Sequence, residues 1–446
     1  MPKYTYIDLF CGPGGLTTGF KNAGFKPLIS VEISDWTVKT YARNHDAQVI
    51  PLQILLENKG NLETILIDDD RTCLIHGDVR NVSNDIILEI LKKKFNTDTV
   101  DVVVGCPPCE SFSMAGKRLE TDERNDLFSN LLRIAHCVES KFVFLENVTG
   151  LLTKTRDGIK GGQFQYIVEE FEKRNPDTGN KYVLASKDKN EVKLLAIDYG
   201  VPQKRERIFL VGCNSKYGSN PFKYPQKTHG KSRTYSYLKV SDALFDLPEI
   251  FSGEGSDIME YNCTYLEAYS CGKINASQYY YLKFIRGDEG YIPDHIVLDK
   301  TIVTSHKASD HRPYMVERFK NIKQGESMHN AVERLISEGK EDIVQMYFPK
   351  KLFSARGRTL KEDEPSFTVT SHCFDEMLHP NCFRGLTPRE AARLQTFPDW
   401  YVFEGKYVVF HSSPEQDRYE QIGDAVPVLL AREMAKELYS ALEVLH

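Results

Sequence analysis

The chain has 446 residues, of which 41% are hydrophobic and 27% charged, with 57 Lys and Arg against 63 Asp and Glu. This composition is ordinary for a globular protein, and the formal charge of −6 argues against a histone-like or ribosomal-type nucleic-acid binder. The ten scattered cysteines are too sparse for a secreted disulfide scaffold, so we expect reduced thiols in a cytosolic enzyme of two or three domains.

The N-terminal residues carry no basic region followed by an apolar stretch and a cleavage site, so no targeting segment is predicted. No run approaches the roughly 18 apolar residues of a membrane helix. We therefore expect a cytoplasmic protein without a membrane segment.

The first half of the chain alternates short apolar runs with amphipathic stretches. Strands are predicted at 4–10, 26–33, 72–77, 100–105, 142–147 and 207–213, and helices near 15–23, 35–44, 82–94, 125–139 and 164–174. The runs at 100–104 and 142–145 are nearly continuous, as in strands buried on both faces of a parallel sheet. This alternation predicts a doubly wound α/β domain.

A glycine-rich turn, Asp8-Leu9-Phe10-Cys11-Gly12-Pro13-Gly14-Gly15, follows the first predicted strand and opens the first helix. Glycines allow a ligand to approach the backbone closely. Glu32 ends the second predicted strand and suits ribose hydroxyls, and Asp78 ends the third and suits an adenine edge. Thr17 stands where a dinucleotide fingerprint has its third glycine, and no basic residue is placed for a pyrophosphate, which favours S-adenosylmethionine. A tight turn without a ligand is the alternative.

The cysteine loop, Gly105-Cys106-Pro107-Pro108-Cys109, follows the most hydrophobic predicted strand. Its prolines restrict the backbone and fix the direction of the next side chain. A thiol at a strand end in an α/β crevice is placed to act as a nucleophile when its pKa is lowered. Half of a zinc site and a redox pair are the alternatives. No second closely spaced cysteine pair supports the first, and two prolines between the thiols are unusual for the second, so no metal site is predicted.

Glu146-Asn147-Val148 ends the next predicted strand, which would bring Glu146 toward Cys109. A buried carboxyl beside a reacting base can have a raised pKa and donate a proton; a helix cap is the alternative. Arg205 and Arg207 alternate onto one face at the start of a strand. Two guanidiniums there can bind a phosphate or a carbonyl oxygen, unless the face is simply solvated.

These motifs, in this order, resemble the DNA cytosine-5 methyltransferase family of the bacterial restriction–modification type. The resemblance covers nearly the whole chain except about 225–380. Three further blocks share it: 122–128, Leu386-Thr387-Pro388-Arg389-Glu390-Ala391-Ala392-Arg393-Leu394-Gln395, and Gly423-Asp424-Ala425-Val426-Pro427. In the second block, Thr387, Pro388 and Glu390 also predict a helix start with a capping box.

The resemblance implies a class I S-adenosylmethionine-dependent, Rossmann-like fold and a covalent mechanism. The target cytosine is flipped from double-stranded DNA, the Cys109 thiolate attacks carbon 6, and Glu146 protonates or hydrogen-bonds ring nitrogen 3. Arg207 would bind the base carbonyl, and Arg205 would help position the cysteine loop or a phosphate. The implied cofactor pocket consists of Phe10, Gly12, Gly14, Gly15, Glu32, Asp78, Val79, Pro108, Leu127 and Asp424.

Three positions depart from the family pattern. Glu110 stands where glutamine is common, and Cys106 where glycine or phenylalanine is more frequent. Asp424 replaces the usual asparagine, which weakens the case for its contact with the cofactor. None of the three departures removes a group that performs the chemistry.

The resemblance implies a catalytic domain over 1–225, completed by 418–446, and a target-recognition domain over 226–417. Residues 214–240 hold six Lys and Arg, no Asp or Glu, and interleaved aromatics, and 343–361 hold five more Lys and Arg. Such stretches suit phosphate contacts, although a solvated surface would look the same. With 214–240 contributing +6 to the total of −6, the other 419 positions sum to −12.

We expect a monomer in the prokaryotic cytoplasm, working at the nucleoid, with double-stranded DNA and a companion restriction endonuclease of the same site as partners. A tRNA methyltransferase of a minority branch of the family is an alternative. The separate RNA cytosine-5 family uses a cysteine in the block where this chain has Glu146-Asn147-Val148, which argues against that route. A catalytically silent DNA-binding module is disfavoured by the presence of Cys109, Glu146, Arg205 and Arg207.

Overall fold

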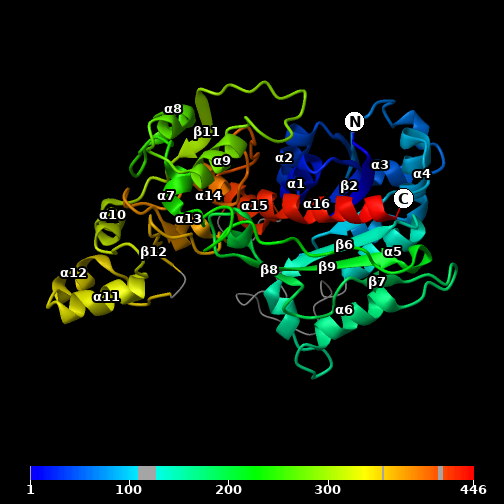
Figure 1. The fold of residues 1–446 in the computed structure, drawn as a ribbon. Helices are drawn as coiled ribbons and strands as arrows, with labels where there is room; N and C mark the ends of the chain where they lie inside the picture. The colour runs from blue at the N-terminus through cyan, green and yellow to red at the C-terminus, as the bar shows by residue number, and fades with distance from the viewer. Residues whose placement is uncertain (1, 109–126, 354–355, 410–414, 446) are drawn as a thin grey trace. The chain divides into compact units, whose positions relative to one another are not determined.

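The computed structural model describes residues 2–108, 127–353, 356–409 and 415–445. The chain forms two compact units, coloured along the sequence in Figure 1. Unit 1 comprises Met1–Leu195, Glu206–Gln226 and Val428–His446, and unit 2 comprises Ala196–Arg205 and Lys227–Pro427. The segments 196–205 and 418–427 thus group with unit 2, whereas the expected catalytic domain included both. The division of roles between the units stays a prediction.

A nine-stranded sheet forms the centre of unit 1, in the order β3-β4-β2-β1-β5-β6-β9-β7, with β8 also paired to β9. The strands from β3 to β6 in this order are parallel, and β9 runs antiparallel to β6, β7 and β8. The structure confirms the six predicted strands and adds the short β3, β7 and β8. The strands are β1 (Tyr4–Leu9), β2 (Phe25–Glu32), β3 (Gln48–Pro51), β4 (Cys73–His76), β5 (Val102–Gly105), β6 (Phe142–Val148), β7 (Tyr182–Leu184), β8 (Lys193–Leu195) and β9 (Glu206–Asn214).

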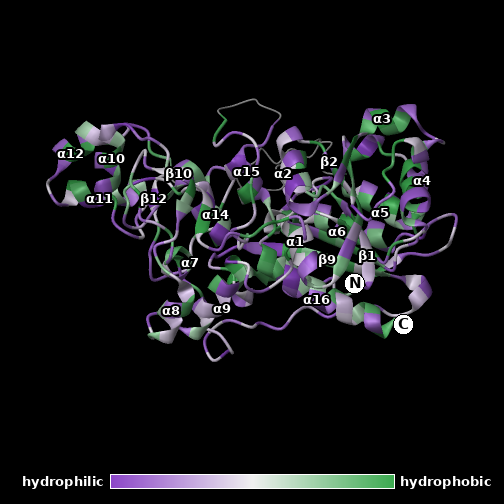
Figure 2. Ribbon diagram, turned by 90° about the horizontal axis from the view of Figure 1, so that it is seen from above, coloured by the Kyte–Doolittle hydropathy of each residue, from purple (hydrophilic) through white to green (hydrophobic). Residues whose placement is uncertain are grey.

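The helices of unit 1 pack apolar faces into one core with the sheet. In α4, Ile86, Ile87 and Ile90 are buried, whereas Lys92 and Lys93 of its last turn are exposed. Figure 2 shows hydrophobic residues in green and hydrophilic residues in purple on this helix. This is the pattern of an amphipathic helix on a sheet. The helices are α1 (Gly15–Asn22), α2 (Asp35–His45), α3 (Leu52–Glu57), α4 (Asn84–Phe95), α5 (Phe128–Cys137), α6 (Gly162–Glu172) and α16 (Val428–Val444), with 3₁₀ turns at η1 (Leu62–Thr64), η2 (Val79–Asn81), η4 (Thr149–Thr153) and η6 (Ser215–Tyr217).

The C-terminal helix α16 completes unit 1 by packing along α1, as Figure 1 shows in red and blue. A Cβ at Gly19 of α1 would lie 2.6 Å from Cβ of Ala431, so glycine permits this close approach. Leu430, Met434 and Leu438 are buried on one face of α16. The chain therefore returns to unit 1 and packs against its first helix.

Unit 2 has little sheet and many short helices. Its strands form the pairs β10–β11 and β12–β13. The capping box predicted at Thr387 and Glu390 is present at the start of α14. In the part of the chain that the structure describes, no helix is long and apolar enough to cross a membrane. The elements are η5 (Ala196–Tyr199), α7 (Val240–Leu244), β10 (Gly255–Glu260), α8 (Tyr265–Ser270), α9 (Ala276–Ile285), β11 (Ile302–Lys307), α10 (Pro313–Lys320), α11 (Met328–Ser337), α12 (Glu341–Tyr347), β12 (Arg358–Thr359), α13 (Cys373–Glu376), β13 (Met377–Leu378), α14 (Pro388–Leu394) and α15 (Arg418–Asp424).

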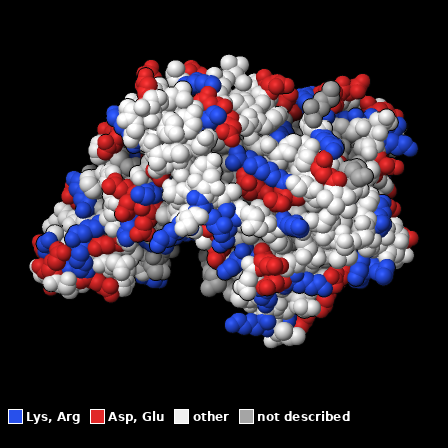
Figure 3. Space-filling view, viewed as in Figure 1, with Lys and Arg blue, Asp and Glu red and all other residues white. Residues whose placement is uncertain are grey.

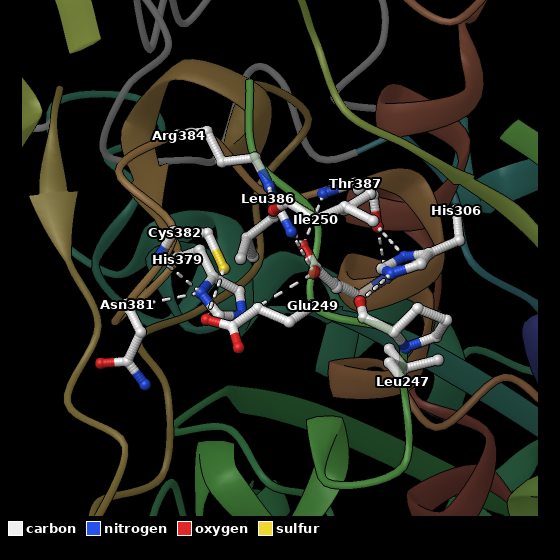
Figure 4. A network of polar contacts seen from close by, with 12 residues as sticks. Leu247, Glu249, Ile250, His306, His379, Asn381, Cys382, Arg384, Leu386 and Thr387 are labelled. Carbon is white, nitrogen blue, oxygen red and sulfur yellow. Dashed lines mark hydrogen bonds and ion pairs between the residues drawn. The ribbon is translucent and has the colours of Figure 1, made fainter. Parts of the chain in front are cut away.

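A buried polar network around the start of α14 joins distant segments of unit 2 (Figure 4). Nε2 of His306 lies 2.8 Å from the carbonyl oxygen of Pro248, and Nδ1 lies 3.0 Å from the Thr387 hydroxyl. Arg384 donates two hydrogen bonds of 2.8 Å to the Glu390 carboxylate and one to the carbonyl of Ile250. These bonds satisfy buried polar groups that would otherwise be costly in a protein interior.

Candidate active site

The predicted site residues of unit 1 gather at one edge of its sheet. Strands β4, β2, β1, β5 and β6 are adjacent and parallel, so their carboxyl ends meet at that edge. Leu9 at the end of β1 pairs with Gly105 of β5, which pairs with Leu145 of β6. The glycine-rich turn, the cysteine loop and Glu146 therefore follow neighbouring strand ends.

The glycine-rich turn reverses the chain between β1 and α1. The N–H of Cys11 donates to the carbonyl of Val31 at 3.1 Å, and the N–H of Gly14 donates to the carbonyl of Cys11 at 3.1 Å. Gly12 and Gly14 have φ of 56° and 95°, values that glycine adopts without steric cost. Phe10 also has a positive φ, 58°, which a side chain rarely adopts. Such backbone strain is typical of a ligand-binding turn.

The Glu32 carboxylate is fixed beside this turn. Its Oε2 accepts a 3.0 Å hydrogen bond from the N–H of Gly12, and its Oε1 accepts from the N–H groups of Ile33 and Ser34 at 2.8 and 3.0 Å. Burial raises the pKa of Glu32, and the three N–H donors oppose that shift. The carboxylate retains lone pairs for two ribose hydroxyls.

Beneath the turn, Asp8 of β1 binds α1 through Thr17, a contact that the sequence analysis missed. The Thr17 hydroxyl donates a 2.5 Å hydrogen bond to Oδ2 of Asp8. Burial, opposed by this hydrogen bond, raises the pKa of Asp8 to about 7. Thr17 stands where a dinucleotide site has its third glycine, and its side chain at this position links α1 to β1.

Asp78 follows β4 and caps the 3₁₀ turn η2, which begins at Val79 and leads into a segment bound by α5. Asp78 accepts from the N–H of Arg80 at 2.9 Å and pairs with its guanidinium at 2.6 Å. A hydrogen bond with Arg80 lowers the pKa of Asp78. Arg133 of α5 donates to the carbonyl of Val82 at 2.9 Å, and Leu127 is buried just before this helix. Arg133 thus positions this segment, and its only sequence signal is a cation within an apolar helical stretch.

The cysteine loop is described up to Pro108; Cys109, Glu110 and the block 122–126 lie outside the described residues. The side chain of Asn147 donates a 3.2 Å hydrogen bond to the carbonyl of Pro107. Burial, the carboxylates of Glu146 and Asp8, and a hydrogen bond with Glu146 raise the pKa of Cys106 well above its usual range. Asn147, quoted in the sequence motif without a role, therefore anchors the loop that leads to Cys109.

Glu146 and Arg207 form an ion pair at the end of β6. Nε of Arg207 lies 3.0 Å from Oε1 of Glu146, and the side chains are 12% and 9% exposed, respectively. A second nitrogen of Arg207 donates to the carbonyl of Glu206 at 2.8 Å, which fixes the guanidinium. The pair presents a carboxyl group beside guanidinium N–H groups, a combination that matches a ring nitrogen next to a carbonyl oxygen.

Arg205 belongs to unit 2 and is fully buried there. Its guanidinium donates to the carbonyls of Val369 at 2.7 Å, Gly423 at 2.8 Å and Ala425 at 3.1 Å. These bonds tie the segment before β9 to Val369 and to the C-terminal end of α15. The structure therefore brings Glu146 and Arg207 together, and it places Arg205 among backbone carbonyls.

The remaining predicted features divide between the units. Asp424 lies in unit 2, where Oδ1 accepts from the Ser371 hydroxyl at 2.9 Å and Oδ2 from the Gln416 amide at 3.0 Å. The basic stretch 214–240 is split at 226, so its two parts belong to different units. Among the residues described, no three His, Cys, Asp or Glu side chains form a group suited to a metal ion.

Comparison with known families gives a match over most of the chain. Residues 4–68 and 73–440 match the model of the family described as C-5 cytosine-specific DNA methylase. The type II methyltransferase M.DdeI of Desulfomicrobium norvegicum is 30% identical over 436 residues, covering 97% of this chain and 88% of that protein. The type II methyltransferase M1.HphI of Haemophilus parahaemolyticus is 30% identical over 438 residues, covering 97% and 86%.

A solved structure shows the same fold. It is a protein assigned as a DNA modification methyltransferase encoded within a prophage of E. coli, superimposed with a TM-score of 0.66 at 23% identity over 99% of this chain and 100% of that one. Together with the parallel-rich sheet, this likeness confirms the predicted doubly wound α/β fold.

Proposed function

The chain belongs to the C-5 cytosine-specific DNA methylase family and is a DNA cytosine-5 methyltransferase that uses S-adenosylmethionine; from this premise, we propose that it modifies one cytosine within a specific double-stranded sequence. The base is flipped into the site and attacked at carbon 6 by Cys109. The Glu146–Arg207 pair at the carboxyl end of β6 is the observation that supports this proposal.

Cys109 supplies the nucleophile because neutral cytosine is too weak a nucleophile at carbon 5. Its thiolate bonds to carbon 6, which makes carbon 5 electron-rich. S-adenosylmethionine supplies the methyl group that carbon 5 takes up. Loss of the carbon-5 proton then expels the thiolate and restores the aromatic ring, so the enzyme is released unchanged.

Glu146 and Arg207 bind the flipped base. The Glu146 carboxyl protonates or hydrogen-bonds ring nitrogen 3, and this stabilises the negative charge that develops when the thiolate adds. Arg207 holds that carboxyl in place and donates a free N–H to the base carbonyl. Arg205 acts as a positioning residue, since its donors are used by carbonyls of unit 2.

The cofactor is held at the carboxyl edge of the unit 1 sheet. The glycine-rich turn is strained at Phe10 and its own residues 8–15 include no Lys or Arg, which suits a ligand with no pyrophosphate. Glu32 would take the ribose hydroxyls, and Asp78 would take the adenine edge once Arg80 yields one oxygen. The proposed pocket comprises Phe10, Gly12, Gly14, Gly15, Glu32, Asp78, Val79, Pro108 and Leu127 of unit 1; the role of Asp424, which lies in unit 2, rests on the family resemblance alone.

The biological setting is proposed from the two relatives described above, both of which are type II methyltransferases. We place the protein in a prokaryotic restriction–modification system, as a cytoplasmic monomer acting on the chromosome beside an endonuclease that cuts the same site. Methylation by this protein would protect that site from its partner.

Covalent trapping tests the proposal. Duplexes in which 5-fluorocytosine replaces cytosine block loss of the group at carbon 5, so a covalent enzyme–DNA complex should accumulate with the wild type on a denaturing gel. Cys109→Ala should give none. Cys271→Ala removes an exposed thiol of unit 2 and is the matched control, which should trap like the wild type. Trapping by Cys109→Ala would refute the nucleophile, and methyl transfer to tRNA in preference to every duplex would refute the substrate.

A further inference from the structure

A tight loop at 228–237 of unit 2, here called the cationic loop, presents two cations at its tip. The N–H of Gly230 donates to the carbonyl of Tyr235 at 2.9 Å, and the N–H of Tyr235 donates to the carbonyl of Thr228 at 3.2 Å. Lys231 and Arg233 lie between these bonds and are exposed. Ser232 between them has φ of 64°, which a side chain adopts only where the surrounding bonds enforce it. The loop is thus a built turn with a defined shape.

Asp198 anchors both ends of the cationic loop. Its carbonyl accepts from the N–H groups of Thr228 and His229 at 3.0 Å each. Its buried carboxylate accepts from the Tyr237 hydroxyl at 2.9 Å and pairs with Lys227 at 2.8 Å. One acidic side chain is therefore used to hold the loop, and the two cations at the tip extend beyond it.

A row of aromatic rings begins within the cationic loop and continues through neighbouring residues of unit 2. The His229 and Tyr235 rings lie 5.1 Å apart, Tyr235 and Tyr280 5.5 Å, Tyr280 and Tyr279 5.4 Å, and Tyr279 stacks on Tyr269 at 4.2 Å. The backbone of Ser236 also donates to the Ser277 hydroxyl at 3.0 Å. Side chains packed in this way lose little further entropy on binding a partner.

The charge of this surface is unbalanced. Within the described residues, Lys231 and Arg233 form no ion pair, whereas other lysines of unit 2 do, such as Lys320 with Glu317 and Lys340 with Glu338. Residues 227–240 contain no Asp or Glu. Figure 3 shows that basic and acidic side chains are interspersed over the face in view. In the part of the chain that the structure describes, the one carboxylate paired with this segment, Asp198, therefore binds Lys227 and leaves the charges of Lys231 and Arg233 without an ion pair.

We infer that the cationic loop binds backbone phosphates of duplex DNA through Lys231 and Arg233, independently of sequence. The inference rests on the proposed function for the identity of the nucleic acid. Lys and Arg on a rigid turn are the usual phosphate ligands, and such contacts orient a protein on the duplex without reading bases. The side chain of Tyr280, which is 46% exposed, supplies a further hydroxyl donor beside the loop.

The salt dependence of binding measures these contacts directly. The affinity of a random 30-base-pair duplex is measured by fluorescence anisotropy over a range of NaCl concentrations. Each phosphate contact contributes about 0.9 to the slope of log affinity against log salt concentration. The variant Lys231→Gln/Arg233→Gln should therefore reduce the slope by about 2 and weaken binding most at low salt.

Two matched variants complete the test. Lys320→Gln/Lys340→Gln removes the same charge from ion-paired positions of unit 2 and should leave the slope unchanged. Lys231→Arg/Arg233→Lys keeps the charge and should retain the wild-type slope, which separates charge loss from misfolding. Equal salt slopes for Lys231→Gln/Arg233→Gln and Lys320→Gln/Lys340→Gln would overturn the inference. The inference would also be overturned if the wild type and Lys231→Gln/Arg233→Gln differed in mass on sedimentation without DNA. That result would assign the surface to a protein partner.

The outcome is independent of the test of the nucleophile. If 5-fluorocytosine trapping succeeds but the slope does not change, the cationic loop has another role and the proposed function stands. If trapping and methylation of DNA both fail, the proposed function fails whatever the slope.

Discussion

The interior of unit 1 is largely apolar, whereas unit 2 fully buries four arginines, Arg205 among them. In unit 1, residues such as Val103 and Leu131 belong to one continuous core around the sheet. In unit 2, Arg384, Arg389 and Arg393 are fully buried. The two units are thus folded around different kinds of interaction, although one chain forms both.

The difference has consequences for how each unit responds to change. Apolar contacts are non-directional and many, so a core such as that of unit 1 tolerates substitutions of similar volume. A buried guanidinium is stable only while its carboxylates are in place, since removing one partner leaves an uncompensated charge. Arg393 pairs with Asp399 at 2.7 Å and with Asp246, so three segments of unit 2 depend on one side chain.

The largest expected effect is therefore that of Arg393→Met. We expect this change to destabilise unit 2 by about 3–5 kcal/mol, because Asp246 and Asp399 lose their shared cation. The chain has two tryptophans, Trp36 in unit 1 and Trp400 in unit 2. In a Trp36→Phe background, Trp400 fluorescence reports urea unfolding of unit 2.

The control for this experiment introduces a methionine into the core of unit 1. Leu131→Met, followed through Trp36 in a Trp400→Phe background, should cost less than about 1.5 kcal/mol because the volume is conserved. An equal loss at the two sites would remove the distinction between the units.

The pH dependence of stability should have opposite signs at one group of each unit. Burial raises the pKa of Asp8 in unit 1 to about 7 and lowers the pKa of His379 in unit 2 to about 4. Asp8 holds a proton in the folded state that the unfolded chain releases near pH 4, so its contribution is lost as pH rises toward 7. His379 stays neutral where the unfolded chain is protonated, so its contribution is lost as pH falls from about 6.5 to 4.

Each group contributes up to about 1.4 kcal/mol per pH unit in its window. Asp8→Asn should make the unfolding midpoint of unit 1 fall less steeply between pH 4 and 7. His379→Gln should make the unfolding midpoint of unit 2 rise less steeply between pH 4 and about 6.5. The midpoints are measured with the two tryptophan reporters at half-unit steps of pH. A variant with the slope of its parent would exclude that group as the source.

The same contrast explains what could be predicted from the sequence. Strands such as β5 and β6 were predicted because their β-branched and aromatic runs are continuous. Strands β7 and β8 have only three residues each, which is too short for a periodic pattern, and β3 (Gln48–Pro51) has only two apolar residues before a proline. In unit 2 the helix at Thr387 was predicted from its local capping signal, but the burial of Arg393 was not, since its partner Asp246 is 147 positions away.

The site was predicted to a similar degree. The order of motifs led to Glu146 and Arg207, and the structure brings them together. The roles of Thr17, Arg133 and Asn147 were missed because each is a contact to another strand end or loop, which only the sheet order creates. The position of Cys109 lies outside the described residues, so its role stays a prediction that covalent trapping decides.

The smallest expected effect comes from removing one helix-capping hydroxyl in each unit. The Ser83 hydroxyl caps α4 of unit 1 and accepts from the N–H of Ile86 at 3.3 Å, so Ser83→Ala should cost about 1 kcal/mol. The Thr387 hydroxyl caps α14 of unit 2 at 3.2 Å and also contacts Nδ1 of buried His306. Thr387→Ala removes the cap and leaves that nitrogen without its partner, which adds about 1–3 kcal/mol.

Thr387→Ser separates the two contributions, because it keeps the hydroxyl and removes only a methyl group. It should restore most of the stability that Thr387→Ala loses, as measured by urea unfolding with Trp400 as the reporter. If Ser83→Ala and Thr387→Ala cost the same, the hydroxyl of unit 2 acts only as a helix cap. The buried polar network would then contribute nothing beyond the local signal that the sequence already contains.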